Sequence, residues 1–123
     1  MVLSDRDIKL ELAQGRIVVE PLDLADVQPA SVDVRLGSSF RIFRNSTHMF
    51  IDPTTDQPEL TEAIEVPEGG QFVLHPGQFV LGTTLERIAV PDDILGKLEG
   101  KSTLGRLGLM IHSTAGYVDP GWD

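Results

Sequence analysis

Short apolar runs separated by turn residues constrain this chain more than any other feature of its sequence. Residues 72–74 and 79–81 are apolar and flank residues 75–78 (HPGQ), where Pro and Gly stand at positions that a tight turn favours. Residues 31–36 alternate polar and apolar side chains, which is typical of a half-buried strand. Several such runs in one chain predict a mainly β fold, either a sandwich or a jelly roll.

Helical signals are concentrated at the amino terminus. Ser4 is suited to an N-cap, and Asp5 and Asp7 favour the positive end of a helix dipole. An apolar pair spaced i,i+4 follows, and Gly15 stands where a glycine often ends a helix. The sequence therefore predicts a helix over residues 4–14.

The remaining segments predict further short strands in a single domain. Four runs fit strands, namely 16–19, 40–43, 63–66 and 83–90, and the rest of 52–70 fits loop. The length of 123 residues and the lack of an internal repeat or linker predict one domain over residues 1–123. The sequence stops just after the turn residues 119–121, so we expect the natural protein to be longer.

Composition excludes several classes of function. The chain has no Cys, which excludes disulfides, thiolate catalysis and Cys-based zinc sites, and its three His are far apart. A net charge of -9 disfavours bulk attraction to nucleic acid. No apolar run reaches the roughly 18 residues of a membrane span, and no signal core begins the chain. We therefore expect a cytoplasmic protein that binds neither nucleic acid nor membrane.

Residues 100–106 (GKSTLGR) combine small residues, two hydroxyls and two cations. If Ser102 opens a short helix, the backbone N–H groups of its first turn, together with Lys101 and Arg106, can hold a polyphosphate. A solvated turn followed by a capped helical turn explains the same composition. The spacing is not that of a Walker A loop.

Residues 112–121 (HSTAGYVDPG) form a second candidate segment. The small residues around Gly116 allow a flat ligand to approach the backbone closely, and Asp119 can accept a hydrogen bond from a sugar hydroxyl. A strand and turn, with Asp119 favouring the turn through its side chain, is the alternative interpretation.

The stretch GKSTLGRLGLMIHSTAGYVDPGW resembles the core motif of the dCTP deaminases, which are relatives of the trimeric dUTPases. Three more segments resemble the same family in the same order, namely residues 3–8 (LSDRDI), 28–37 (QPASVDVRLG) and 74–81 (LHPGQFVL). Together they extend over essentially the whole chain. The resemblance is strongest to the bifunctional, dUMP-forming members.

This resemblance implies a fold, an assembly and a set of site residues. The fold is a dUTPase-like distorted β-barrel or jelly roll with a short amino-terminal helix, in a homotrimer whose active sites lie between subunits. Asp119 matches the residue that binds deoxyribose, and Asp33 matches an aspartate near the metal-bound triphosphate. Ser102 lies near the reacting base and phosphates, and Arg106 positions and polarises the site. The segment that binds dCTP or dUTP comprises Lys101, Ser102, Thr103, Leu104, Gly105 and Arg106.

The resemblance also implies a zinc-independent reaction in which water attacks C4 of cytosine and a glutamate transfers protons. That glutamate belongs just after the PGW turn, beyond Asp123, so we expect no catalytic base within these residues and little or no activity from them alone. Mg²⁺ accompanies the triphosphate. We expect no metal ligand from the chain itself.

Two branches of the family differ just after the shared Thr-Ala dipeptide. By resemblance, Gly116 and Tyr117 fit the branch that converts dCTP to dUMP and pyrophosphate, since its members carry a Gly and an aromatic or apolar residue at these positions. A glycine also leaves room for backbone and water to rearrange. Alternatively, Gly116 serves only the geometry of the turn. Three other functions stay open: a deaminase that releases dUTP, a plain dUTPase, and a non-catalytic nucleotide-binding module.

Overall fold

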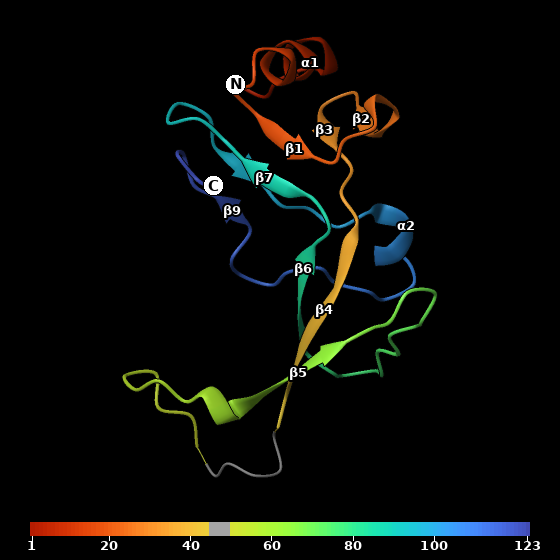
Figure 1. Ribbon diagram of the computed structural model, residues 1–123, viewed down its shortest axis with the longest axis vertical. Helices are drawn as coiled ribbons and strands as arrows, with labels where there is room; N and C mark the ends of the chain where they lie inside the picture. The colour runs from red at the N-terminus through yellow and green to blue at the C-terminus, as the bar shows by residue number, and fades with distance from the viewer. Residues whose placement is uncertain (45–49) are drawn as a thin grey trace. The chain divides into compact units, whose positions relative to one another are not determined.

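The computed structural model covers all 123 residues and describes residues 1–44 and 50–123. Short strands predominate in the described chain, with two α-helices and two 3₁₀ turns (Figure 1). The helices are α1 (Asp5–Ala13) and α2 (Ser102–Gly105), and the 3₁₀ turns are Leu24–Asp26 and Pro58–Leu60. The strands are β1 (Val18–Glu20), β2 (Val27–Gln28), β3 (Ser31–Val32), β4 (Leu36–Phe43), β5 (Thr61–Glu65), β6 (Val80–Thr84), β7 (Arg87–Ala89), β8 (Gly96–Lys97) and β9 (Tyr117–Val118).

The chain forms two compact units. The first unit comprises residues Met1–Asp33 and Glu86–Asp123, and the second comprises Val34–Leu85. All the candidate site residues named above belong to the first unit. The prediction of a single domain over residues 1–123 stays a prediction.

Helix α1 begins and ends within one residue of the predicted bounds. Ser4 has the extended backbone of an N-cap residue, but its Oγ donates to Asp7 Oδ2 at 3.1 Å and makes no bond to a backbone N–H. Gly15, at a φ of 69°, follows the end of the helix, as predicted. The helix packs against β2 and buries Ile8.

Three antiparallel strand pairs build the rest of the first unit. β1 pairs with β7, with Val19 opposite Ile88, and Val19 is buried. β2 and β3 form a tight hairpin. β8 pairs with β9, with Lys97 opposite Tyr117, which fixes the two segments that contain the candidate site against one another.

The second unit is a three-stranded antiparallel sheet in the order β5-β4-β6. Its central strand, β4, buries Phe40, whose ring stacks on Phe72 with centroids 4.4 Å apart. The ring of Phe40 also covers Gly82 of β6, where an added Cβ would lie 3.3 Å from it. Phe43 and Phe79 make a second ring contact at 5.5 Å.

Three strand predictions need correction. Residues 72–74 are not a strand, although the turn after them is confirmed by Gly77 at a φ of 78° and a bond from Gln78 N to His75 O at 3.0 Å. The predicted strand 31–36 is interrupted over residues 33–35, between β3 and β4. The predicted strand 83–90 is divided at residues 85–86, where Glu86 is buried.

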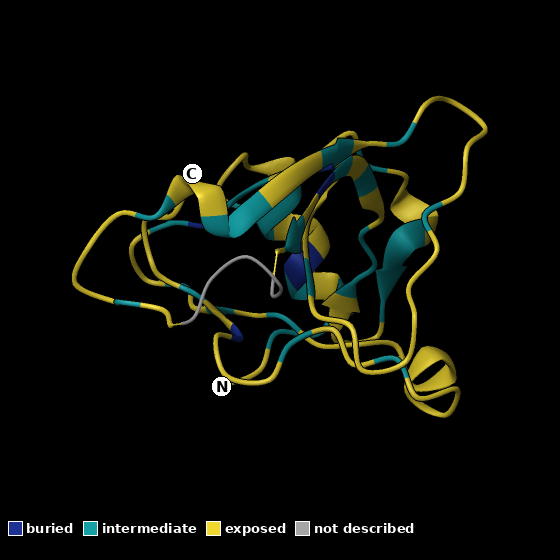
Figure 2. Ribbon diagram, turned by 90° about the horizontal axis from the view of Figure 1, so that it is seen from below, coloured by how far each residue is buried: buried dark blue, intermediate teal, exposed yellow. Residues whose placement is uncertain are grey.

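Few of the described residues are buried (Figure 2). Ile8, Val19, Phe40 and Val90 form the buried apolar set, and none of the described side chains is fully enclosed. Neither unit therefore has a large buried core in its described part. Within the described residues, no helix combines the length and apolar character needed to cross a membrane.

Candidate functional site

Helix α2 starts at Ser102, which meets the condition on which the anion-binding interpretation of residues 100–106 depends. Lys101 is its N-cap residue, and the first turn closes through bonds of 3.0 Å from Gly105 N to Lys101 O and from Arg106 N to Ser102 O. The first N–H groups of a helix lack partners within it and point outward. Residues 101–106 are all exposed, so their hydroxyls and cations are accessible to a ligand.

Lys101 forms an ion pair with Asp33, with Nζ 2.7 Å from Oδ2. Asp33 is the better enclosed partner, with 25% of its side chain exposed against 60% for Lys101. Its own backbone is held by a bond of 2.9 Å from Asp33 N to Asp26 O. The pair therefore holds the lysine of the candidate segment close to the end of β3.

The second candidate segment packs on the strand that leads to α2. Leu98 N donates to Gly116 O at 2.7 Å, which extends the pairing of β8 and β9 by one residue. The side chain of Ile111 covers Gly100, where an added Cβ would lie 3.0 Å from its Cγ1. The ring of His112 covers Gly116 in the same way. Residues 111–116 thus lie directly against residues 98–100.

Gly116 does not occupy the left-handed region of backbone space, in contrast to Gly108 and Gly121. A requirement of turn geometry therefore does not explain glycine at this position. Its backbone is buried, whereas Tyr117 beside it is 66% exposed. The space above its Cα is occupied by the imidazole of His112.

Asp119 precedes a turn that is fastened to the end of β7. Trp122 N bonds to Asp119 O at 3.1 Å, and Val90 N bonds to Trp122 O at 3.0 Å. Gly121 has a φ of 80°, and the carboxylate of Asp92 lies 2.8 Å from the place of its missing Cβ. Asp119 itself is exposed on this anchored turn.

Lys97 and Glu99 carry the shifted pKa values nearest to the site. The hydrogen bond from Lys97 lowers the pKa of the Glu99 carboxyl, and the same bond raises the pKa of Lys97. The two charged atoms are 2.5 Å apart and both side chains are mostly exposed. This pair stays ionised at neutral pH and does not suit a proton-transferring acid or base.

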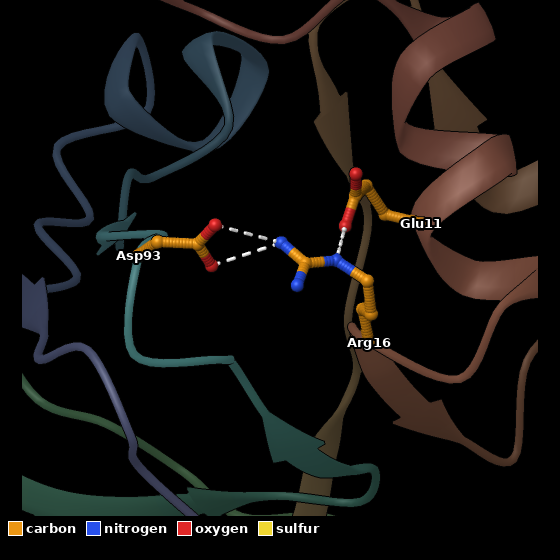
Figure 3. Close-up of polar contacts among 3 residues, drawn as sticks. All are labelled: Glu11, Arg16 and Asp93. Atoms are coloured by element: carbon orange, nitrogen blue, oxygen red, sulfur yellow. Dashed lines mark hydrogen bonds and ion pairs between the residues drawn. The ribbon is translucent and has the colours of Figure 1, made fainter.

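A second ionic cluster fastens α1 to the turn after β7 (Figure 3). Arg16 Nε donates to Glu11 Oε2 at 2.6 Å, and its Nη2 lies 2.9 Å from both carboxylate oxygens of Asp93. The bond to Glu11, followed by that to Asp93, raises the pKa of Arg16. All three groups are engaged with one another, so the cluster has a structural role.

Metal-binding geometry is lacking in the described part of the chain: no three His, Cys, Asp or Glu side chains gather there closely enough to hold an ion. Asp33, which contacts the candidate segment, already pairs with Lys101.

The structure brings some of the predicted site residues together. It pairs Lys101 with Asp33 and packs Gly116 beside Leu98. Within residues 1–44 and 50–123, no hydrogen bond or ion pair joins Arg106 or Asp119 to Lys101. The contact of His112 with Gly116 was not predicted from the sequence. The only available signal was their i,i+4 spacing across three small residues.

The mainly β fold and the exposed Gly-Lys-Ser-Thr turn define a small β protein with a candidate anion-binding segment. A family model described as dCTP deaminase-like matches residues 2–123, and the chain belongs to this family.

Curated relatives with a dCTP deaminase name match the chain over nearly its full length. A dUMP-forming dCTP deaminase of Rhodococcus opacus is 59% identical over 123 residues, which is 100% of this chain and 65% of the relative. A protein of the same name from Mycolicibacterium paratuberculosis is 59% identical over 122 residues, which is 99% of this chain and 64% of the relative. The chain thus spans just under two thirds of the length of these relatives.

Among solved structures, the crystal structure of 2′-deoxycytidine 5′-triphosphate deaminase from Agrobacterium tumefaciens has a similar fold. The TM-score is 0.68 at 25% identity, and the match covers 98% of this chain and 37% of that one. The predicted mainly β, dUTPase-like fold with a short amino-terminal helix is therefore confirmed.

Proposed function

We propose that the protein encoded by the complete gene converts dCTP and two water molecules into dUMP, ammonia and pyrophosphate. The observation that supports this most directly is the 59% identity, over the full length of this chain, to proteins named dUMP-forming dCTP deaminases. No observation favours release of dUTP, a plain dUTPase or a non-catalytic module.

The proposed reaction has two hydrolytic steps. In the first, water adds to C4 of cytosine, the bond from C4 to the exocyclic nitrogen breaks, and ammonia leaves. In the second, water attacks the α-phosphorus, the bond from that phosphorus to the α–β bridging oxygen breaks, and pyrophosphate leaves. Neither step needs an oxidant or a second substrate.

Residues 101–106 are proposed to bind the substrate. The exposed cations Lys101 and Arg106 and the hydroxyls of Ser102 and Thr103 surround the first turn of α2, which suits a triphosphate. Leu104 and Gly105 complete the segment, and Ser102 and Arg106 support the chemistry as positioning groups. The proton-transferring glutamate is proposed to lie beyond Asp123.

Asp119 is proposed to bind the deoxyribose. After it, Gly121 and Trp122 form backbone hydrogen bonds with residues 90–91, and before it Val118 pairs with Gly96, so the exposed carboxylate stands on a backbone that is held on both sides. This acceptor is proposed to bind the 3′-hydroxyl and so to set the sugar where a 2′-hydroxyl does not fit. We expect kcat/KM for CTP to be at least about 100-fold below that for dCTP.

The proposal includes Mg²⁺ bound to the triphosphate and a reaction without zinc. The chain has no Cys, and its described residues do not gather three carboxylate or imidazole ligands. This donor set suits an ion that arrives on the phosphates and offsets their charge. We also propose a cytoplasmic homotrimer with active sites between subunits, which the exposed position of residues 101–106 permits.

Separate incubations with dCTP, dUTP and CTP test this proposal. We expect ammonia and pyrophosphate in equal amounts from dCTP with Mg²⁺, and little of either from CTP. Pyrophosphate from dUTP without ammonia from dCTP would instead indicate a dUTPase. Binding of dCTP with no turnover of any nucleotide would indicate a binding module.

A further inference from the structure

We infer that Arg87 of β7 is a positioning residue, which binds Asp123 and so fixes how the polypeptide beyond Asp123 joins the open edge of β7. The relatives are longer than this chain, which spans 65% of one and 64% of another. The proposed proton-transferring glutamate lies on the polypeptide beyond Asp123. This inference therefore rests on the proposed function and adds to it the contact that sets where the glutamate stands.

The turn of residues 119–122 begins an antiparallel pairing with the end of β7. Gly121 N donates to Pro91 O at 3.2 Å, and Val90 N donates to Trp122 O at 3.0 Å. The residue numbers rise along one segment as they fall along the other, so the two segments run in opposite directions. The carboxyl-terminal end of the described chain accordingly lies along β7 (Figure 1).

The register of these two bonds indicates which residues pair next. It places Asp123 opposite Ala89, and the residue that follows Asp123 opposite Ile88. Backbone groups of successive strand residues point to opposite edges, so those of Ile88 face the same edge as Val90 N. Among the described residues, no backbone partner for Ile88 is found at that edge. Since β1 occupies the other edge of β7, this edge is the one open to the continuing chain.

The side chain of Arg87 binds Asp123 across this open edge. Arg87 Nη2 forms an ion pair with Asp123 Oδ1, a side-chain oxygen that is retained when the chain continues. In the register above, the two residues are diagonal neighbours on one face, a separation that long side chains span. Glu20 lies directly opposite Arg87 in the β1–β7 ladder, yet the ion pair that Arg87 forms with a described residue is the one with Asp123.

This ion pair affects the register of the continuing strand more than the stability of the fold. The side chains of Arg87 and Asp123 are 51% and 61% exposed, and exposed pairs add little to stability. A shift in strand register by one residue turns every side chain to the opposite face of the sheet. A charged contact at Asp123 favours the register in which it lies opposite Ala89. The pair thereby also determines which face the proposed glutamate occupies.

Five versions of the protein encoded by the complete gene test the pair: the natural sequence, Arg87→Gln, Arg87→Lys, Asp123→Asn, and Arg87→Gln combined with Asp123→Asn. We measure kcat and KM for dCTP. Arg87→Gln and Asp123→Asn should each lower kcat about fivefold or more, because a displaced glutamate is poorly aligned with the base. KM should change by less than about twofold, since residues 101–106 are untouched. Arg87→Lys retains the charge and should regain most of the lost kcat.

The combined variant should match either single variant within about twofold, because both substitutions remove the same contact. Glu20→Gln is the matched control, since Glu20 faces Arg87 from β1 and should leave kcat within about twofold of the natural value. The inference is wrong if the two single effects multiply, or if Glu20→Gln lowers kcat as much as Arg87→Gln. A raised KM with an unchanged kcat would also contradict it.

Hydrogen exchange tests the register without any turnover. In the natural protein, the backbone amide of the residue after Asp123 should be protected, because it donates to Ile88 O in the inferred register. Arg87→Gln should speed its exchange about tenfold, whereas the amide of Val90 stays protected by Trp122. An unprotected amide in the natural protein, or equal exchange in both proteins, would overturn the inference even if a variant is too unstable to assay. Failure of the natural protein to release ammonia would reject the proposed function and leave this exchange test valid.

Discussion

Lys101 and Asp33 illustrate how a single contact connects distant parts of the sequence. The pair joins the end of β3 to the start of α2, yet the lysine is 60% exposed. Exposed ion pairs add little to stability, because water and salt screen them. The contact therefore fixes the position of Lys101 more than it stabilises the fold.

The first prediction concerns Lys101→Ala, compared with the control Lys9→Ala. Lys9 also forms an exposed ion pair, with Asp5 at 3.2 Å on α1. Both variants should melt within about 3 °C of the natural protein, since neither pair is buried. Only Lys101→Ala should weaken dCTP binding, by about tenfold, as measured by calorimetry. Equal affinities for the two variants would remove Lys101 from the proposed site.

At this scale the sequence predicted which residue types could bind a nucleotide, but not their contacts. The composition of residues 100–106 indicated an anion-binding segment on the condition that a short helix opens at Ser102, and that helix is present. The ring of His112 over Gly116 was not predicted, because it depends on the pairing of Leu98 with Gly116, which joins residues 18 positions apart. Pairing over such separations is set by the tertiary fold and leaves no local pattern.

Among the helices and strands, α1 is stabilised by charged side chains close together in its own sequence. Lys9 is the main cause of the lowered pKa of Asp5, through a hydrogen bond, and Arg6, followed by Ser4, lowers the pKa of Asp7 in the same way. Both carboxylates fall below the ordinary value of 3.8. Their ionised forms therefore stabilise the folded helix above that value, and the benefit is lost as the pH falls through the lowered pKa values.

The second prediction follows from the lowered pKa values of Asp5 and Asp7. In the double variant Asp5→Asn and Asp7→Asn, that part of the acid sensitivity disappears. Between about pH 5 and pH 2.5, the Tm of the natural protein should therefore fall further than that of the variant, as measured by circular dichroism. Parallel curves over this range would show that the two carboxylates have no linked role.

The third prediction concerns the turn that presents Asp119. Gly121 and Gly15 both have a positive φ, so alanine at either position costs about 1–2 kcal/mol in backbone strain. Only Gly121 also faces a carboxylate, that of Asp92, whereas an added Cβ at Gly15 meets nothing within 4 Å. Gly121→Ala should therefore lower the Tm further than Gly15→Ala.

Removing the carboxylate provides the control for this turn. In an Asp92→Ala background, the effect of Gly121→Ala should shrink to that of Gly15→Ala, because only the strain at positive φ is left. If the excess loss persists without Asp92, the close approach in the structure is not its cause.

Helix α1 was predicted more accurately from the sequence than the strands were. Helix α1 was predicted within one residue because its caps and spacing are local. Residues 72–74 have the composition of a strand, but Phe72 stacks on Phe40 without joining the ladder. The apolar pattern indicates that these side chains pack against others. It does not indicate whether their backbone pairs with a neighbouring strand.

For the molecule as a whole, an acidic chain and an anionic ligand are compatible because positive charges are concentrated at the proposed site. The net charge of -9 opposes an anionic substrate, whereas the proposed site places two cations within residues 101–106. The anchored turn of residues 119–122 and the β8–β9 ladder hold the candidate segments within one compact unit. The proposed function thus depends on local geometry and on the family to which the chain belongs.

The most direct test of the central claim is a time course of the nucleotides formed from dCTP and Mg²⁺ by the protein encoded by the complete gene. Ion-exchange chromatography separates dCTP, dUTP and dUMP. We predict that dUMP and pyrophosphate accumulate together from the earliest points, with no free dUTP. Accumulation of dUTP as the end product would contradict the dUMP-forming assignment and the role given to Gly116 and Tyr117.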